Sequence, residues 1–178
     1  VVVNLYPFES TIAKKNVGLD QAIEQIDIGG PTMLRAAAKN FHSVVAVCCH
    51  KRYDPLLKEL KTLKGRLSRE TSFELARETF AHTAWYDAAI AGYLSGKGPS
   101  SSEVFPKRMI LRALKQQDLR YGENPHQRAA FYQSFPALHV PLEADQTVPL
   151  GLAGAKQLHG KHLSFNNLLD LSSALGLV

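Results

Sequence analysis

The chain has 178 residues, of which 45% are apolar and 21% are charged, a composition typical of a folded globular protein. Its longest apolar runs fall far short of the roughly 20 residues that span a bilayer, and its net charge of +5 is spread along the chain, which suits anionic small molecules at least as well as nucleic acid. The adjacent Cys48 and Cys49 exclude a disulfide framework, so a reducing cytoplasm is the expected location.

Neither end of the sequence carries the signals of a natural terminus. The chain opens on three valines without a methionine or a signal-peptide pattern, and it stops at Val178 inside an apolar helical pattern. We therefore expect a fragment of a longer parent protein.

The first half of the chain alternates strand and helix patterns. Residues 1–5 and 43–49 are apolar, largely β-branched runs that predict buried strands. The spacing of apolar residues predicts helices over 19–26, 31–40 and 55–63. In the last of these helices the expected inward side chains are Leu56, Leu57, Leu60 and Leu63. This order of elements predicts a parallel α/β layer.

A long helix follows, with Ser68 as its predicted N-cap and Leu94 near its end. Its expected inward face consists of Phe73, Ala76, Phe80, Ala84, Ala88 and Ala91. Residues 96–108 begin with a Gly-, Ser- and Pro-rich stretch and predict a linker between domains at 1–95 and 109–178. The second domain is expected to contain a strand at 129–135, an irregular stretch at 136–149 and a helix at 163–178.

Three polar motifs carry candidate chemistry. In residues 26–32 (IDIGGPT), two glycines precede a proline-started helix whose first N–H groups could bind an oxyanion, although Asp27 and the glycines also suit a plain cap and turn. Residues 119–127 (LRYGENPHQ) hold an arginine suited to phosphate, or form a solvated turn. Residues 160–170 place two carboxamides at a helix entrance, as caps or as ligand contacts. The seven histidines lack ligand spacing, so no metal site is expected.

Five strings along the chain carry a family pattern: NLYPF at 4–8, EQIDIGGPTMLRAAAKN at 24–40, HTAWYDAAI at 82–90, LRYGENPHQ at 119–127 and GKHLSFNNLLDL at 160–171. Together they resemble the bifunctional purine biosynthesis proteins, which join IMP cyclohydrolase to AICAR formyltransferase. The resemblance implies part of a methylglyoxal-synthase-like parallel-sheet domain, followed by the start of a cytidine-deaminase-like formyltransferase domain.

The resemblance also implies an activity. The parent would transfer a formyl group from 10-formyltetrahydrofolate to AICAR and then close the ring of formyl-AICAR to IMP. Its partners would be purine nucleotides, without nucleic acid, membrane or metal, and it would be a cytoplasmic homodimer. We expect the fragment alone to be inactive, because the family's catalytic lysine-histidine pair should lie beyond Val178; Lys161 and His162 are not that pair.

Residue roles follow from the same resemblance. Catalytic roles fall on Tyr6, Asp27 and Lys39, and substrate contacts on Asn4, Ile28, Gly29, Gly30, Arg120, Tyr121 and Asn167. The match alone supports Lys39, because a continuous helix over 31–40 would carry it about 15 Å along the axis.

Two other functions remain open: a basic nucleic-acid-binding module and a structural interaction domain. The cluster at Lys107, Arg108, Arg112 and Lys115 lacks the interleaved aromatic residues of stacking platforms, which disfavours the first. A salt-dependent gel shift would support the first, and unresponsive Gly29 and Arg120 in nucleotide titrations would support the second.

Overall fold

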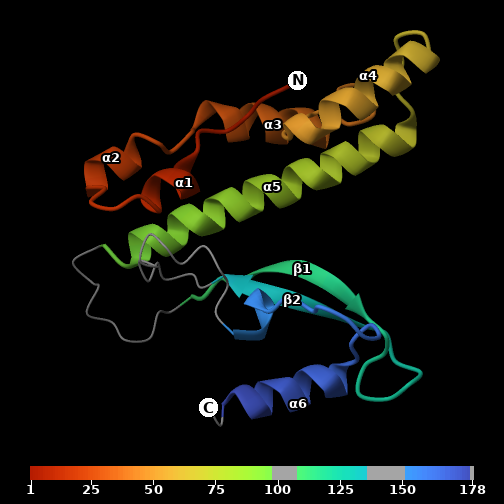
Figure 1. The fold of residues 1–178 in the computed structure, drawn as a ribbon. Coiled ribbons are helices and arrows are strands. Elements are labelled where there is room, and N and C mark those ends of the chain that lie inside the picture. Colours follow the sequence, from red (N-terminus) through yellow and green to blue (C-terminus); the bar gives the residue numbers. More distant parts are fainter. Residues whose placement is uncertain (98–107, 136–150, 177–178) are drawn as a thin grey trace. The chain divides into compact units, whose positions relative to one another are not determined.

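The computed structural model of the chain describes residues 1–97, 108–135 and 151–176. The chain divides into two compact units, Val1–Val104 and Phe105–Val178. Helices make up most of unit 1, and unit 2 combines a small antiparallel sheet with helices, so the protein is of the α/β class in the broad sense (Figure 1). The irregular stretch expected at 136–149 and most of the expected linker lie outside the described residues.

Unit 1 is built around helices. In chain order they are α1 (Phe8–Ile12), α2 (Leu19–Ile23), α3 (Gly29–Lys39), the 3-10 helix η1 (His50–Arg52), α4 (Tyr53–Thr62) and α5 (Arg69–Ser95). The sequence analysis missed α1, which is little more than one turn long. It follows Pro7, whose fixed φ favours a helix start, and buries Phe8 and Ile12 at i,i+4 spacing.

The long helix α5 is the central element of unit 1. Its predicted N-cap is confirmed, because the Ser68 hydroxyl accepts a hydrogen bond from the Thr71 N–H at 3.1 Å. Glu59 of α4 also stabilises this turn, because its carboxylate accepts hydrogen bonds from the Ser68 N–H and the Thr71 hydroxyl, each at 2.7 Å. These two hydrogen bonds lower the pKa of Glu59. Helix α3 packs along α5 (Figure 1).

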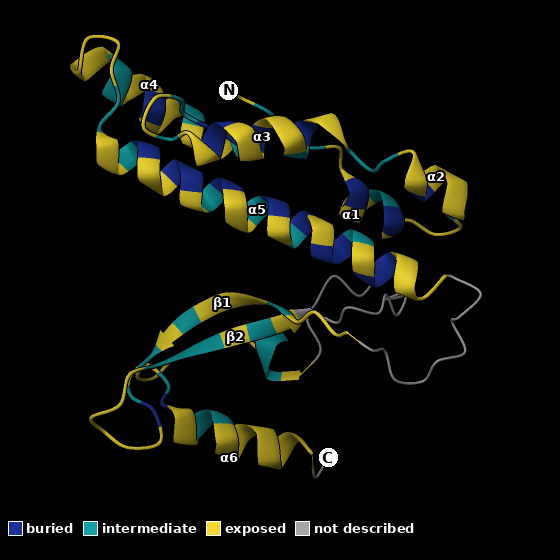
Figure 2. Cartoon of the chain, turned by 180° about the vertical axis from the view of Figure 1, so that it is seen from behind, coloured by how far each residue is buried: buried dark blue, intermediate teal, exposed yellow. Residues whose placement is uncertain are grey.

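The predicted inward face of α5 was wrong for four of its six residues. Ala76 and Ala88 are buried, but Phe73, Phe80, Ala84 and Ala91 are exposed. The buried stripe instead contains Leu75, Ala76, Thr79, Thr83, Tyr86, Ala89 and Tyr93 (Figure 2).

Threonine explains the error on this helix. The Thr83 hydroxyl donates to the Phe80 carbonyl of the preceding turn at 3.2 Å, so this polar residue is buried with its hydrogen bond made inside the helix. The two phenylalanines lie at the rim, where Phe73 packs edge-on against Phe41 and Arg35 lies over the Phe80 ring.

Three apolar clusters form the core of unit 1, and α5 contributes to each. Phe8 is the centre of the first, with edge-to-face contacts to Tyr86 and Tyr93 at ring-centroid distances of 6.2 and 5.7 Å. The second cluster joins α3 to Ala76, and the third joins Val47 and α4 to Leu75. The helix therefore connects every buried part of this unit.

The two strands expected at 1–5 and 43–49 pair in the expected parallel sense but over a single bridge, Val2 to Val47. The Val3 N–H donates to the Val47 carbonyl at 3.0 Å, and the Val47 N–H donates to the Val1 carbonyl at 2.9 Å. A lone pair of parallel segments makes few hydrogen bonds, so the described residues hold no extended parallel sheet. The predicted parallel layer is corrected to one bridge.

Several helix boundaries also differ from the prediction. Helix α2 ends at Ile23 rather than at residue 26, and α3 begins at Gly29, ahead of the proline. In α4 only one of the four leucines expected inward, Leu56, is buried, whereas Leu57 and Leu63 are exposed. The ten-residue helix α4 packs against α5 through a narrow contact between Leu56 and Leu75. The other leucines of α4 lie outside this contact.

Unit 2 contains an antiparallel pair of strands, β1 (Arg112–Leu119) and β2 (Ala129–Phe135). The strand predicted at 129–135 is confirmed, but β1 was missed because RALKQQDL lacks apolar alternation. A register shift between Lys115 and Gln117 leaves Gln116 as a bulge, and its amide donates to the Gln133 side chain at 3.2 Å.

The remaining elements of unit 2 are the 3-10 helix η2 (Gly151–Gly154) and α6 (Phe165–Leu175). Helix α6 lies within the helix predicted at 163–178 and contains no buried residue (Figure 2). Among the described residues of this unit only Gly122 and Ser164 are buried, and both belong to polar motifs.

We predict that Leu75→Ala lowers the free energy of unfolding of unit 1 by about 2–5 kcal/mol, because deleting a buried leucine leaves a cavity. Phe73→Ala on the same helix is the control, with an expected loss below about 1.5 kcal/mol. The exposed fractions are 3% for Leu75 and 52% for Phe73. Urea denaturation followed by the fluorescence of Trp85, the single tryptophan, measures both. Equal losses would contradict the observed face of α5.

Candidate functional site

The first candidate site lies at the start of α3, where the Asp27 carboxylate holds two backbone segments. Its Oδ1 accepts from the Gly30 N–H at 2.7 Å, and its Oδ2 accepts from the Tyr6 N–H at 3.4 Å. The first contact is a helix cap, so the capping interpretation of Asp27 is realised in the structure. The same contact fixes where the carboxylate lies.

The close approach of this carboxylate requires a glycine at position 30. A Cβ at this position would lie 2.5 Å from Asp27 Oδ2 and 2.7 Å from the Leu5 side chain, both far inside van der Waals contact. Any other residue would push the Asp27 side chain away. The second glycine of the motif is therefore required by close approach.

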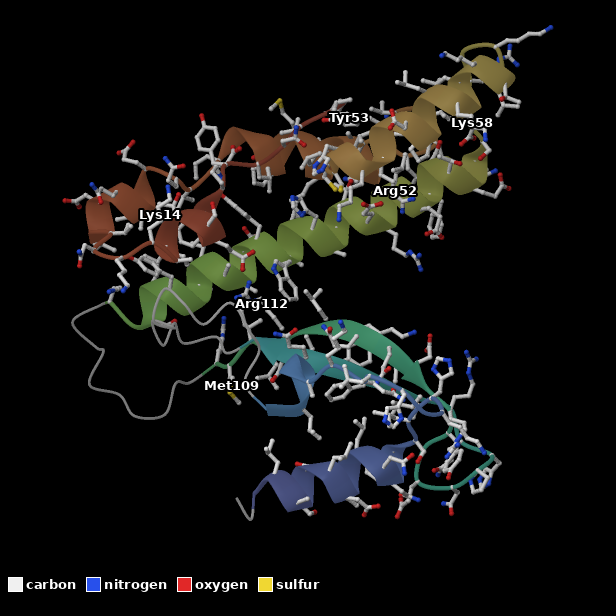
Figure 3. All side chains as sticks on the ribbon, viewed as in Figure 1. Lys14, Arg52, Tyr53, Lys58, Met109 and Arg112 are labelled. Carbon is white, nitrogen blue, oxygen red and sulfur yellow. The ribbon has the colours of Figure 1, made fainter. Side chains whose placement is uncertain are left out.

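The residues around this carboxylate leave an open surface. Ile28 is 75% exposed, Gly29 is exposed, and Tyr6 is exposed at the end of the first segment. Asn4 lies on the same segment, and its amide donates to the hydroxyl oxygen of Tyr53 at 3.1 Å. Tyr53 is the first residue of α4 (Figure 3). The structure thus brings Tyr6, Asp27 and Gly30 into direct contact, with Ile28 and Gly29 beside them.

Lys39 is not part of this cluster. It lies exposed in the last turn of α3, where a cation interacts favourably with the helix dipole. It is nine positions after Gly30, which is roughly 13 Å along a helix axis. A substrate would have to extend along α3 to meet both ends.

The sequence analysis missed Tyr86, which touches the Asp27 segment from α5. Its hydroxyl accepts from the Asp27 N–H at 2.8 Å and donates to the Gln25 carbonyl at 3.0 Å. The string HTAWYDAAI contains this residue, but the predicted inward face of the long helix does not include it. The signal appears only once the buried stripe of α5 is known, because a buried phenol on that stripe needs a hydrogen-bond partner.

The second candidate site joins two motifs of unit 2. The Arg120 N–H donates to the Leu163 carbonyl at 2.8 Å, and the Phe165 N–H donates to the Tyr121 carbonyl at 3.1 Å. These bonds place residues 119–127 beside the entrance of α6. The guanidinium of Arg120 lies over the Tyr121 ring, 5.0 Å from its centroid.

Ser164 is the polar centre of this site. Its hydroxyl accepts from the Asn167 N–H at 3.3 Å, and the Asn167 Oδ1 accepts from the Ser164 N–H at 3.1 Å, which is a reciprocal capping box. A hydrogen bond from Ser164, together with one from Arg120, lowers the pKa of Tyr121. Of the two carboxamides expected at this helix entrance, Asn167 takes part in the cap and is oriented by it, whereas the Asn166 amide donates to the Glu123 carbonyl at 3.3 Å.

The loop between these contacts is held by a glutamine. The Gln127 side chain accepts from the Asn124 N–H at 2.8 Å, and its carbonyl accepts from the Gly122 N–H at 2.9 Å. A Cβ on Gly122 would lie 3.0 Å from that of Gln127, so a larger residue would require Gln127 to shift by a few tenths of an ångström. The turn keeps Arg120 and Tyr121 in place from one side, as α6 does from the other.

Other features of the described residues lie apart from these sites. A cavity of about 430 Å³ between β1, β2, η2 and α6 is lined by Leu168 and Leu171 but by none of Arg120, Tyr121 and Asn167. Lys161 and His162 are exposed. Both cysteines are free, and burial raises the pKa of the Cys48 thiol.

Two further features are absent from residues 1–97, 108–135 and 151–176. No three His, Cys, Asp or Glu side chains in this part of the chain gather as metal ligands. None of its helices combines the length and apolar character needed to cross a bilayer.

Comparison with known proteins gives close relatives over the whole chain. The bifunctional purine biosynthesis protein PurH of Anoxybacillus flavithermus is 52% identical over 178 residues, and that of Gloeothece citriformis is 50% identical over 179. Each match covers 100% of this chain and 32% of the relative, so the chain spans about a third of its relatives' length.

One solved structure and one family profile complete the comparison. The structure, described as the crystal structure of ForH, is 39% identical and covers 38% of this chain and 36% of its own, with a TM-score of 0.37. The profile of the AICARFT/IMPCHase bienzyme matches residues 37–178, and the relatives extend the match over the Asp27 cluster. The chain belongs to the AICARFT/IMPCHase bienzyme family.

Proposed function

We propose that this chain is part of a bifunctional enzyme of purine nucleotide synthesis. One activity transfers a formyl group from 10-formyltetrahydrofolate to the 5-amine of AICAR, and the other closes formyl-AICAR to IMP. The observation that carries the proposal is the match of PurH proteins across both units, at about 50% identity and including both polar clusters. Each cluster would supply part of one active site.

The Asp27 cluster of unit 1 would serve ring closure. In that step the carboxamide nitrogen attacks the formyl carbon and loses one proton, the formamide nitrogen loses the other, and the formyl oxygen leaves as water. The Asp27 carboxylate would accept from the carboxamide N–H, and the Tyr6 hydroxyl would exchange a proton nearby. The Gly30 N–H is already bonded to Asp27. The backbone N–H groups of Ile28 and Gly29 would therefore be the donors to the substrate oxygen that gains negative charge.

Asn4 and Lys39 complete the proposed residues of this site. Asn4 would contact the base, since it lies two residues before Tyr6 on the same segment. The role of Lys39 rests on the family resemblance, and it requires a nucleotide that lies along α3. We propose it as a catalytic cation for the part of the substrate farthest from Asp27.

The Ser164 cluster of unit 2 would bind AICAR for formyl transfer. Arg120 would pair with the phosphate through its planar guanidinium, and Tyr121 would pack beside it. Because the Asn167 Oδ1 accepts from Ser164, the Asn167 amide would act as a donor toward the carboxamide oxygen of AICAR. The downstream residues of the parent would supply the formyl-transfer chemistry.

The finer assignments of fold and assembly belong to the same proposal. We assign residues 1–95 to a methylglyoxal-synthase-like cyclohydrolase domain, 96–108 to a linker and 109–178 to the start of a cytidine-deaminase-like formyltransferase domain. The parent would be a cytoplasmic homodimer that needs no metal and acts on nucleotides rather than on nucleic acid or membranes.

We predict that Asp27→Asn in the full-length protein lowers the turnover of ring closure about tenfold or more while formyl transfer changes less than about twofold. The reason is that a neutral amide keeps the shape of the side chain but is a weaker acceptor. Absorbance assays with formyl-AICAR, and with AICAR plus 10-formyltetrahydrofolate, measure the two activities. Equal loss of both activities in a folded protein would refute the assignment.

We predict the opposite selectivity for Arg120→Ala. Losing charge-assisted contacts worth roughly 1.5–3 kcal/mol should raise the Michaelis constant for AICAR about 10- to 100-fold in formyl transfer. Ring closure should stay unchanged, and Arg128→Ala, an exposed arginine outside the cluster, is the matched control. An unchanged Michaelis constant would limit Arg120 to a structural role.

A further inference from the structure

The segment between α2 and α3 has no regular secondary structure, yet it must hold a carboxylate in one place. Residues 24–28 follow the short α2 and precede Gly29, where α3 begins. The Tyr86 hydroxyl bonds this segment twice, at the Gln25 carbonyl and at the Asp27 N–H. One oxygen atom therefore bridges two residues on either side of Ile26.

The Tyr86 ring is itself held firmly. The residue is only 6% exposed, on the buried stripe of α5, and its ring makes an edge-to-face contact with Phe8. Phe8 is 1% exposed and makes a second edge-to-face contact, with Tyr93. The hydroxyl thus projects from the rigid core of unit 1 into the Asp27 segment.

We propose that Tyr86 is a positioning residue for ring closure: its hydroxyl fixes the backbone of Asp27, and through it the carboxylate that meets the substrate. This inference rests on the proposed function of Asp27. The path is continuous, because the Asp27 carboxylate in turn bonds the N–H groups of Gly30 and Tyr6. Tyr86 touches none of the reacting atoms in this scheme.

The protonation state of the phenol suits this role. Burial raises the pKa of Tyr86, opposed in part by the hydrogen bond from the Asp27 N–H, and the nearby Asp27 charge adds to the increase. A raised pKa keeps the phenol neutral up to a higher pH than a free tyrosine. A neutral hydroxyl donates and accepts at once, as the contacts with Gln25 and Asp27 require.

Tyr86→Phe in the full-length protein removes only this hydroxyl and keeps the ring packing. Hydrogen-exchange mass spectrometry of peptides spanning residues 25–30 should show faster exchange, because the Asp27 N–H loses its acceptor. The kcat for ring closure should fall about tenfold, with the Michaelis constant and formyl transfer changed less than about twofold.

Thr83→Val is the matched control. It removes a fully buried hydroxyl from the same face of α5, one that bonds the Phe80 carbonyl within the helix. This variant should leave both the exchange of residues 25–30 and the kcat unchanged. An equal loss of kcat in Thr83→Val would overturn the proposal, because any lost hydroxyl of α5 would then have the same effect.

A double-mutant cycle with Asp27→Asn separates the two proposals. If Tyr86 acts through the Asp27 carboxylate, Tyr86→Phe should lower the residual kcat of Asp27→Asn by less than about twofold. A full tenfold loss in that background, or unchanged exchange at residues 25–30, would overturn the positioning role. Normal ring closure in Asp27→Asn alone would instead refute the proposed function, and the exchange data would then still decide whether Tyr86 holds the segment.

Discussion

The carboxylate of Asp27 is the constraint on which the arrangement of unit 1 depends. It binds the first turn of α3 and the segment that carries Tyr6, while the backbone of the same residue is bound from α5. Asp27 and the adjoining start of α3 are thus joined to two stretches that are far apart in the chain, one through the Asp27 side chain and the other through its backbone. Gly30 has no room for a Cβ because this carboxylate occupies the space.

Capping and function are not alternatives in either cluster. Asp27 caps α3 and Asn167 caps α6, and each does so with a side chain that the proposed chemistry also needs. A cap holds a polar group in one rotamer, which reduces the entropy lost when a ligand binds. Ser164 serves unit 2 in the way that Tyr86 serves unit 1, as a buried hydroxyl that orients a more exposed neighbour.

The sequence predicted structural features well only where local signals were strong. The N-cap at Ser68 and the strand at 129–135 were found because a capping serine and an aromatic-rich run are unambiguous. The face of α5 was missed because periodicity counts alanine and phenylalanine as inward and threonine as outward, whereas Thr79 and Thr83 are fully buried.

The candidate sites show the same contrast between what local patterns predict and what depends on contacts distant in the chain. Motif composition drew attention to residues 26–32, 119–127 and 160–170 but suited a plain cap or turn as well, and the roles of Asp27, Gly30, Arg120 and Asn167 came from the family resemblance. Tyr86 lies 59 residues from Asp27, and no local pattern encodes that contact. The strand β1 was hidden in a similar way, since its polar residues pair with β2 mainly through backbone hydrogen bonds, which leave no apolar alternation in the sequence. The bulge at Gln116 bends this ribbon, and Lys115 beside it is paired with Asp118. A bent, charged strand is a poor template for the edge of another molecule's sheet, so the folded form of β1 disfavours strand addition by a second chain.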